Sequence, residues 1–175
     1  MRLECGVCVV RSWQSGDEEG IVRHGDNRNI WLQLRDRFPH PYTHADAERW
    51  LAHALQAQPE TNFAIALGDE VVGGIGYQFG IDVERFSAEI GYWLGEALWG
   101  RGIATAALRA VTRHAFATHE LNRLFALPFA RNLSSIRVLE KAGYVREGVL
   151  RHSAVKEGVV LDQVLYAVIR SEQPS

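Results

Sequence analysis

The feature that most constrains the fold is residues 91–111, GYWLGEALWGRGIATAALRAV, where a strand pattern changes to a helical one. Before the change, residues 85–95 alternate: Ala88, Ile90, Tyr92 and Leu94 share one predicted face, and Glu89, Gly91 and Trp93 share the other. After it, one helical stripe contains Ile103, Ala107, Leu108, Val111 and Ala115. A strand that leads at once into an amphipathic helix predicts a sheet with this helix packed on one face.

The turn between the two elements, residues 99–105 (WGRGIAT), favours an anion. The free N–H groups and the dipole of a helix N-terminus attract negative charge. Gly100 and Gly102 leave the backbone unobstructed, and Arg101 adds a positive charge. A P-loop is excluded because no Lys-Ser/Thr pair follows, and a dinucleotide-binding turn lacks its third glycine and its distant acid. A tight turn that binds no ligand remains the alternative.

The rest of the chain supplies alternating strand and helix patterns without repeats or linkers. The order β-α-α-β-β-β-α-β-α-β-β predicts an α/β (α+β) domain with a mixed sheet and helices packed on it. The predicted strands are 7–12, 62–67, 70–80, 85–95, 121–130, 144–151 and 159–170. The predicted helical segments are 15–38 (one or two helices), 44–58 after an N-cap at Thr43, one from Gly100, and 132–143 closed by Gly143.

Size and composition limit the function classes. The 175 residues are interpreted as one domain, 1–175, and the net charge of −2 argues against a nucleic-acid partner. The longest uncharged stretch falls short of the roughly 18 residues of a membrane span, so we expect no membrane partner and a cytoplasmic location. Cys5 and Cys8 form one C-x-x-C without a second pair, and the seven histidines show no ligand spacing, so no metal is expected.

A second motif follows the turn: Asn132-Leu-Ser-Ser135 runs on to Glu140-Lys141-Ala-Gly143-Tyr144. Together with residues 99–104, it resembles the GNAT N-acetyltransferase superfamily, and most of all the branch of the ribosomal-protein N-terminal (alanine or serine) acetyltransferases. The resemblance covers nearly the whole chain. It departs from the family at Trp99, where glutamine or arginine is usual. It implies a single-domain fold with a mostly antiparallel sheet whose central strands splay apart.

The resemblance implies acetyl-CoA as co-substrate and no metal. The turn would hold the pyrophosphate, and the strand ending at Leu94 would bind pantetheine and polarise the thioester carbonyl with a backbone N–H. Gly91 and Gly95 fit a bulge or a close backbone approach in this strand. The residues expected at the coenzyme are Trp93, Leu94, Trp99, Gly100, Arg101, Gly102, Ile103, Ala104, Thr105, Asn132, Ser135 and Lys141.

Three residues are the candidate catalytic groups. Glu89 lies in an apolar strand, where burial would raise its pKa toward that of a general base; an ion pair with an arginine across the sheet is the alternative. The family's usual tyrosine acid is replaced by Leu139, so the resemblance assigns proton donation to Ser135. Asn132 would bind pantetheine or an ordered water, although Asn132 is equally suited to cap the helix.

The acceptor is expected between the early helices and the late hairpin. Trp31, Phe38, Tyr42 and, near the predicted loop 153–160, His152 are the candidate contacts, with core packing as the alternative. The resemblance favours a protein N-terminal α-amine attacked in a ternary complex. A free amino acid, another small amine, or acyl-CoA binding without turnover remain alternatives; convergence of the three catalytic candidates would argue against the last. Family members often dimerise, which makes the late strands a candidate homodimer edge.

Overall fold

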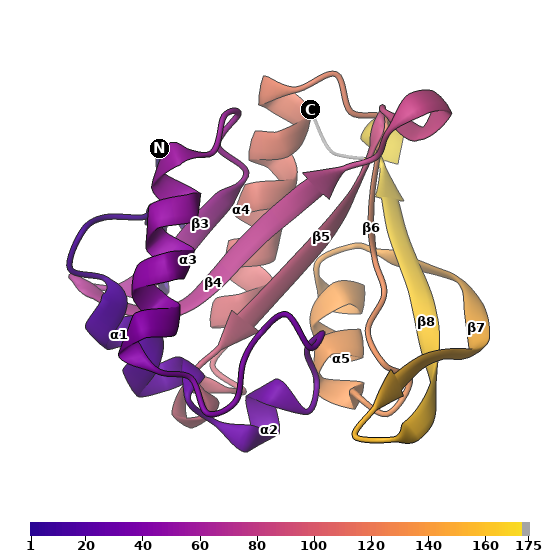
Figure 1. Cartoon of the computed structure of the whole chain (residues 1–175). Coiled ribbons are helices and arrows are strands. Elements are labelled where there is room, and N and C mark those ends of the chain that lie inside the picture. The colour runs from indigo at the N-terminus through magenta and orange to yellow at the C-terminus, as the bar shows by residue number, and fades with distance from the viewer. Residues whose placement is uncertain (173–175) are drawn as a thin grey trace.

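The computed structural model describes residues 1–172 and shows a single twisted sheet with helices on both faces (Figure 1). Its eight strands lie in the order β1-β2-β3-β4-β5-β6-β8-β7. Only the neighbours β5 and β6 are parallel. The predicted α/β class with a mixed, mostly antiparallel sheet is therefore confirmed. The strands are β1 (Arg2–Glu4), β2 (Val9–Ser12), β3 (Asn62–Leu67), β4 (Glu70–Phe79), β5 (Ser87–Leu94), β6 (Arg123–Ala126), β7 (Val145–Lys156) and β8 (Val159–Ile169).

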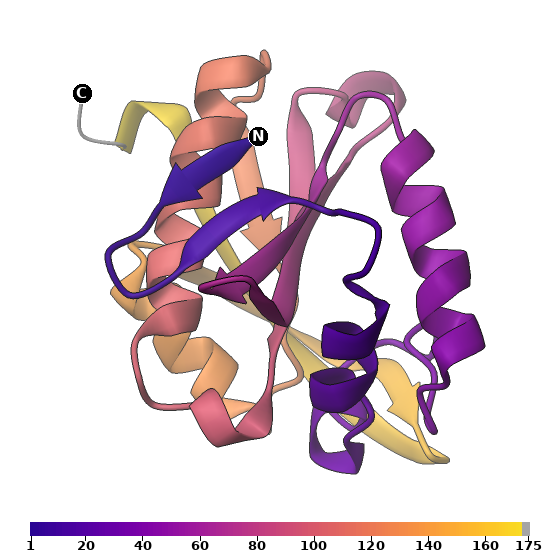
Figure 2. The same ribbon diagram turned by 90° about the vertical axis from the view of Figure 1, so that its left-hand side faces the viewer.

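The helices form two layers. Seen edge-on, α1 and α3 cover one face of the sheet, and α4 and α5 cover the other (Figure 2). None of the helices described in residues 1–172 has the length and apolar character needed to cross a membrane. The helices are α1 (Glu18–Gly25), α2 (Arg28–Trp31), α3 (His44–Gln56), α4 (Ile103–Thr118) and α5 (Leu133–Lys141), with 3₁₀ turns η1 (Asp82–Glu84), η2 (Glu96–Leu98) and η3 (Arg170–Glu172).

The sequence patterns explain the long elements. Thr43 caps α3 as predicted: its hydroxyl accepts from Asp46 N, and the Asp46 carboxylate accepts from Thr43 N, which forms a capping box. Gly68 turns the predicted β3–β4 hairpin with a φ of +60°. The predicted stripe of α4 is fully buried, and it comprises Ile103, Ala107, Leu108, Val111 and Ala115.

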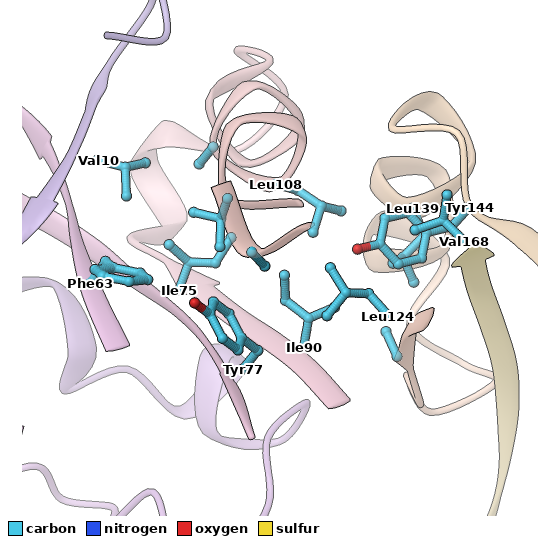
Figure 3. Close-up of a cluster of buried hydrophobic side chains, with 14 of the residues drawn as sticks. Val10, Phe63, Ile75, Tyr77, Ile90, Leu108, Leu124, Leu139, Tyr144 and Val168 are labelled. Carbon is cyan, nitrogen blue, oxygen red and sulfur yellow. The ribbon is translucent and has the colours of Figure 1, made fainter. Parts of the chain in front are cut away.

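The main core lies between the sheet and the α4/α5 layer. Figure 3 shows Leu108 of α4 and Leu139 of α5 pointing toward Ile90 and Leu124 of the strands. β5 divides its side chains as predicted: the even-numbered ones face this core, whereas Trp93 packs against the smaller α1/α3 core. Strand β5 therefore presents different chemistry to the two sides of the sheet.

The N-terminal prediction was incomplete. The predicted strand over residues 7–12 corresponds to β2, but it pairs with an additional strand, β1, and the C-x-x-C forms the turn between them. Cys5 N donates to Cys8 O over 2.9 Å in this turn. The three-residue segment Arg2–Glu4 half-buries only its central leucine, so its alternation is too short to predict a strand.

Two later predictions also need correction. Only residues 123–126 of the strand predicted over 121–130 form a strand, β6. The chain leaves β5 after Phe125 and continues beside β8 alone. The loop predicted over 153–160 is mostly strand: β7 continues to Lys156 past an irregularity between Leu150 and Ala154, and the turn is formed at Glu157 and Gly158.

The parallel pair at the centre of the sheet is short. β5 and β6 pair only from Ser87 to Glu89, opposite residues 123–125. Beyond Glu89, β5 keeps β4 as its neighbour on one side and has no strand of the described chain on the other. We call this opening the β5–β6 gap, and it is the splay that the predicted fold requires.

Candidate active site

The turn between β5 and α4 depends on glycine. Gly100 and Gly102 have φ angles of +77° and +78°. This left-handed region costs other L-residues about 1–2 kcal/mol. A Cβ on either glycine would meet no atom within 4 Å. The glycines are therefore needed for the backbone conformation, and the space in front of the turn is open.

The first turn of α4 leaves its backbone donors unused. Gly102 is the N-cap and provides no side-chain cap, and the Ala106 N–H is the first to bond back, to Gly102 O at 3.0 Å. Within residues 1–172, the N–H groups of Ile103, Ala104 and Thr105 have no backbone acceptor. Three free donors at the positive end of a sixteen-residue helix form a suitable anion site.

Trp99 fixes this turn to the end of β5. Its indole Nε1 donates to Leu94 O over 2.8 Å, although the residue remains 42% exposed. The N–H of the ring is thus used inside the protein. Any contact between Trp99 and a coenzyme, as predicted, would have to come from the exposed face of the ring.

The backbone of β5 offers free groups to the β5–β6 gap. Gly95 N donates to Val72 O over 2.8 Å, so the odd-numbered residues of β5 direct their backbone groups to β4. Because these directions alternate along a strand, the even-numbered residues from Ile90 to Leu94 direct theirs into the gap. The Leu94 N–H faces the gap, whereas its carbonyl already accepts from Trp99, and the predicted coenzyme contact of Leu94 stays a prediction. The Trp93 backbone faces β4, so a coenzyme contact of Trp93, which also stays a prediction, would have to come from its side chain.

Gly91 in β5 and Gly95 directly after it have different surroundings. The β4–β5 register runs unbroken through Gly91, which pairs with Gly76, so the predicted bulge is not at Gly91. A Cβ at Gly95 would lie 2.7 Å from His24 Nδ1, so Gly95 makes room for a side chain of α1, and the close backbone approach that the sequence suggested stays a prediction. A Cβ at Gly91 would meet no atom, so the surface between Glu89 and Trp93 is open.

At the start of α5, the structure shows the capping alternative for Asn132. Asn132 Oδ1 accepts from Ser135 N over 3.1 Å, so Asn132 is the N-cap, and its amide nitrogen stays available. Ser135 Oγ lies 2.9 Å from Tyr92 Oη, which also donates to Ser135 O at 3.2 Å. Burial raises the pKa of Tyr92, so this phenol keeps its proton at physiological pH. The pair joins β5 to α5 beside the gap.

Glu89 lies on the opposite, α1/α3 face of β5. Arg35, from the loop after α2, donates to Glu89 Oε1. The Glu89 side chain is 32% exposed and lines an open hollow of about 600 Å³. The ion-pair alternative is therefore observed, with an arginine from a loop and not from a neighbouring strand. The expected burial of Glu89 is not found.

The sequence model described as acetyltransferase (GNAT) domain matches residues 8–145, which is most of the chain. The chain belongs to the GNAT acetyltransferase family. The eight-stranded sheet with helices on both faces is thus a GNAT fold.

Relatives of this GNAT chain include the probable N-acetyltransferase YjcK of Bacillus subtilis, 32% identical over 89% of both chains. The ribosomal-protein-serine acetyltransferase of Escherichia coli is 34% identical over 63% of this chain and 62% of its own length. Three further relatives are matched over only 50 to 58% of their lengths. Among solved structures, Mycobacterium smegmatis RimJ in complex with CoA-disulfide has a TM-score of 0.84 and 26% identity, covering 99% of this chain and 87% of that one.

The four residues predicted to contact the acceptor differ in how far they are buried and in what they pack against. Tyr42 is only 6% exposed, and its ring lies 4.8 Å from that of Phe38, which packs on Trp93 at 5.6 Å. The packing alternative is therefore observed for Tyr42, and its expected substrate contact stays a prediction. His152 is exposed on β7 with a φ of +52°, and its backbone N–H donates to Asp162 at 2.7 Å.

Trp31 lies where the early helices meet the late hairpin. Its ring stacks on His40 at 5.5 Å and carries Lys156 Nζ 3.8 Å from its centroid. Lys156 is the last residue of β7, and its side chain is 1% exposed. It donates to Asp36 over 2.7 Å. The loop after α2 is thereby tied to the C-terminal hairpin of the acetyltransferase.

Sequence reasoning missed Tyr92, Arg35 and Lys156 as site residues. A signal existed for Tyr92, because a polar-tipped side chain on a buried face needs a partner. Lys156 and Arg35 lie in polar segments that resemble solvated surface, and their partners are 120 and 54 residues away in the chain. Lys141 ends α5, away from Ser135, and its predicted phosphate contact stays a prediction.

Proposed function

We propose that the chain transfers the acetyl group of acetyl-CoA to a protein N-terminal α-amine, by direct attack in a ternary complex. The observation that carries this proposal is the β5–β6 gap, which lies at the same end of β5 as the glycine turn and the free donors of α4. A buried core strand would have no reason to lack a neighbour along half its length, since unpaired backbone groups are costly to bury.

The chain's own groups fit acetyl-CoA. Pantetheine carries amides, which match the free backbone groups of β5 from Ile90 to Leu94. The pyrophosphate matches the N–H groups at the start of α4 and the exposed Arg101. A backbone N–H in the gap would also polarise the thioester carbonyl and stabilise the oxyanion that develops there.

Proton transfer would use both faces of β5. Glu89, on the α1/α3 face, would accept a proton from the incoming ammonium, and the amine nitrogen would then form a bond to the acetyl carbon. As the carbon–sulfur bond breaks, Ser135 on the α4/α5 side would give its proton to the sulfur, beside the Tyr92 hydroxyl. The nitrogen would lose its second proton to solvent as the amide forms, and Ser135 would regain a proton from solvent. The expected convergence of the three catalytic candidates is therefore not observed as direct contact, and the proposal places Glu89 and Ser135 on opposite sides of the reacting carbonyl.

The acceptor would enter over the α1/α3 face. The hollow beside Glu89 is open and bounded by β4, β5, β6 and the loop after α2, so an extended peptide end can reach the carboxylate. The similarity to the ribosomal-protein-serine acetyltransferase of Escherichia coli supports a protein N-terminus over a free small amine. No acidic cluster of the kind that would favour a polyamine lines the described hollow, because its lining includes only two glutamates, Glu84 and Glu89, and Glu89 is paired with Arg35.

Calorimetric titration with acetyl-CoA tests the coenzyme site. Gly102→Asp places a carboxylate and an unfavourable φ in the turn, and Gly6→Asp is the matched control because Gly6 has the same φ of +78° and equally open surroundings. We expect wild type and Gly6→Asp to bind at about micromolar Kd, roughly −8 kcal/mol, and Gly102→Asp to lose most of this affinity. Equal binding by all three proteins would show that the turn does not hold the phosphates.

Thiol release tests the transfer itself. Peptides with a free N-terminal serine or alanine are compared with the same peptides carrying a blocked N-terminus and with free amino acids. We expect release of free coenzyme only with an unblocked peptide, and loss of that release in Glu89→Gln. Acetyl-CoA binding without turnover on any amine would contradict the enzymatic proposal and leave a binding module.

A further inference from the structure

Arg35 occupies the place where an acceptor ammonium would meet Glu89. Its guanidinium donates to Glu89 Oε1, and both side chains line the hollow on the α1/α3 face. Arg35 is itself 53% exposed, so the pair lies at the opening of the hollow and not in the core. A cationic acceptor that approaches Glu89 must therefore compete with this guanidinium.

The loop that carries Arg35 is built into the fold. The next residue, Asp36, accepts from the buried Lys156 at 2.7 Å, and Lys156 is held over the Trp31 ring. On the other side, Arg131 donates to Leu32 O at 2.8 Å. Because a buried lysine is costly to leave unpaired, these contacts keep the loop, and with it Arg35, beside Glu89.

The other charged groups of the hollow are differently placed. Arg123 is engaged by Glu147 through two hydrogen bonds, so its charge is already balanced. Glu84 belongs to the η1 turn at the β4–β5 end of the hollow. When an ammonium binds Glu89, two cations share one carboxylate, and Arg35 is the one that is left without a full partner.

We propose that Arg35 is a specificity-determining residue for the acceptor. The α-ammonium replaces Arg35 on Glu89, and the released guanidinium binds a carboxylate of the same acceptor. The preferred substrate class is then a peptide whose free N-terminus is followed within the first few residues by an acidic side chain. This inference rests on the proposed transfer to protein N-terminal amines, and it adds which N-termini are selected.

Three peptides that differ at the second residue test the inference: aspartate, asparagine and lysine in an otherwise identical sequence with a free N-terminal serine. We expect kcat/KM of the wild type to be about fivefold higher for the aspartate peptide than for the asparagine peptide, the scale of a partly exposed ion pair. Arg35→Gln removes this preference, and Arg35→Glu reverses it in favour of lysine.

Arg37→Glu is the matched control, because it makes the same charge change two residues away at another exposed arginine of the loop. It should keep the preference for aspartate, and all variants should keep the wild-type KM for acetyl-CoA. Equal kcat/KM for the three peptides in the wild type would overturn the specificity role of Arg35 but not the proposed acetyl transfer. That result would fit a released Arg35 that pairs with Glu84 instead of with the acceptor. An Arg37→Glu reversal equal to that of Arg35→Glu would also overturn it. Absence of turnover on every unblocked peptide would overturn both proposals.

Discussion

Ser135 and Tyr92 form the hydrogen bond on which the proposed proton donation depends. A serine hydroxyl is a weak acid by itself, so a neighbouring hydroxyl that holds it in place favours its transfer of a proton to sulfur. Tyr92 is such a neighbour, and burial raises its pKa further above neutral pH, so the phenol stays uncharged. The hydroxyl pair, at 2.9 Å, is therefore a better catalytic candidate than Ser135 alone.

Removing Ser135 should affect turnover more than binding. We expect Ser135→Ala to lower kcat by about a hundredfold, the lower end of general acid catalysis, with little change in the Kd for acetyl-CoA. Steady-state kinetics and calorimetry on the same preparation measure the two effects. Equal losses in kcat and affinity would assign Ser135 to coenzyme binding instead.

Tyr92→Phe should give a smaller loss of kcat at full acetyl-CoA affinity. Tyr144→Phe is its control, because the Tyr144 hydroxyl makes a comparable buried hydrogen bond to Thr112 at 2.8 Å. Each change should lower the free energy of unfolding by about 1 kcal/mol, measured in urea, and only Tyr92→Phe should slow the reaction. If the two variants kept the same kcat, the role of Tyr92 would be structural.

Helix α5 combines a structural and a candidate chemical role in one residue. Asn132 caps the helix through its side-chain oxygen, and its amide nitrogen has no partner among the described hydrogen bonds. An aspartate at this position would keep the capping oxygen and replace the nitrogen donor with a second acceptor. The element thus allows the two roles to be separated by substitution.

We expect Asn132→Asp to keep the stability of the wild type and to lose activity, because a carboxylate cannot donate to pantetheine or to an ordered water. Asn132→Ala should lower both, with about 1 kcal/mol lost from the free energy of unfolding. Thermal or urea unfolding and thiol release measure the two properties. Full activity in Asn132→Asp would reduce Asn132 to a helix cap.

Across the whole molecule, the sequence predicted those features that depend on residues close to one another in the chain. The α3 capping box, the β3–β4 hairpin and the stripe of α4 each depend on residues that are close in sequence, and all three are confirmed. The turn at residues 99–105 was predicted from its place between a strand and a helix, and the structure adds that Gly100 and Gly102 both have positive φ angles. These elements determine the class of fold, and they supply the part of the candidate site that the sequence assigned to the coenzyme.

The acceptor side depends on contacts between distant segments and could not be predicted. Neither Arg35 nor Asp36 carries a local signal of its partner, and Glu89 was expected to be buried because its strand neighbours are apolar. Like the roles of the site residues, a cytoplasmic location stays a prediction, and so does a homodimer across the β7 edge, where Val149 and Val155 are exposed.

The short β5–β6 pairing has a consequence for how the molecule holds together. Within residues 1–172, the pairing of Ser87 to Glu89 is the only strand pairing between the N-terminal five strands and the C-terminal three, so the pantetheine arm of a bound acetyl-CoA would serve as a partial ninth strand between two half-sheets. Amide hydrogen exchange can detect this. We expect the amides of Ile90, Tyr92 and Leu94 to exchange quickly in the free protein and to slow markedly when acetyl-CoA is added, whereas those of β3 stay slow in both. Slow exchange at all of these positions without the coenzyme would mean that the β5–β6 gap is already closed by the protein itself.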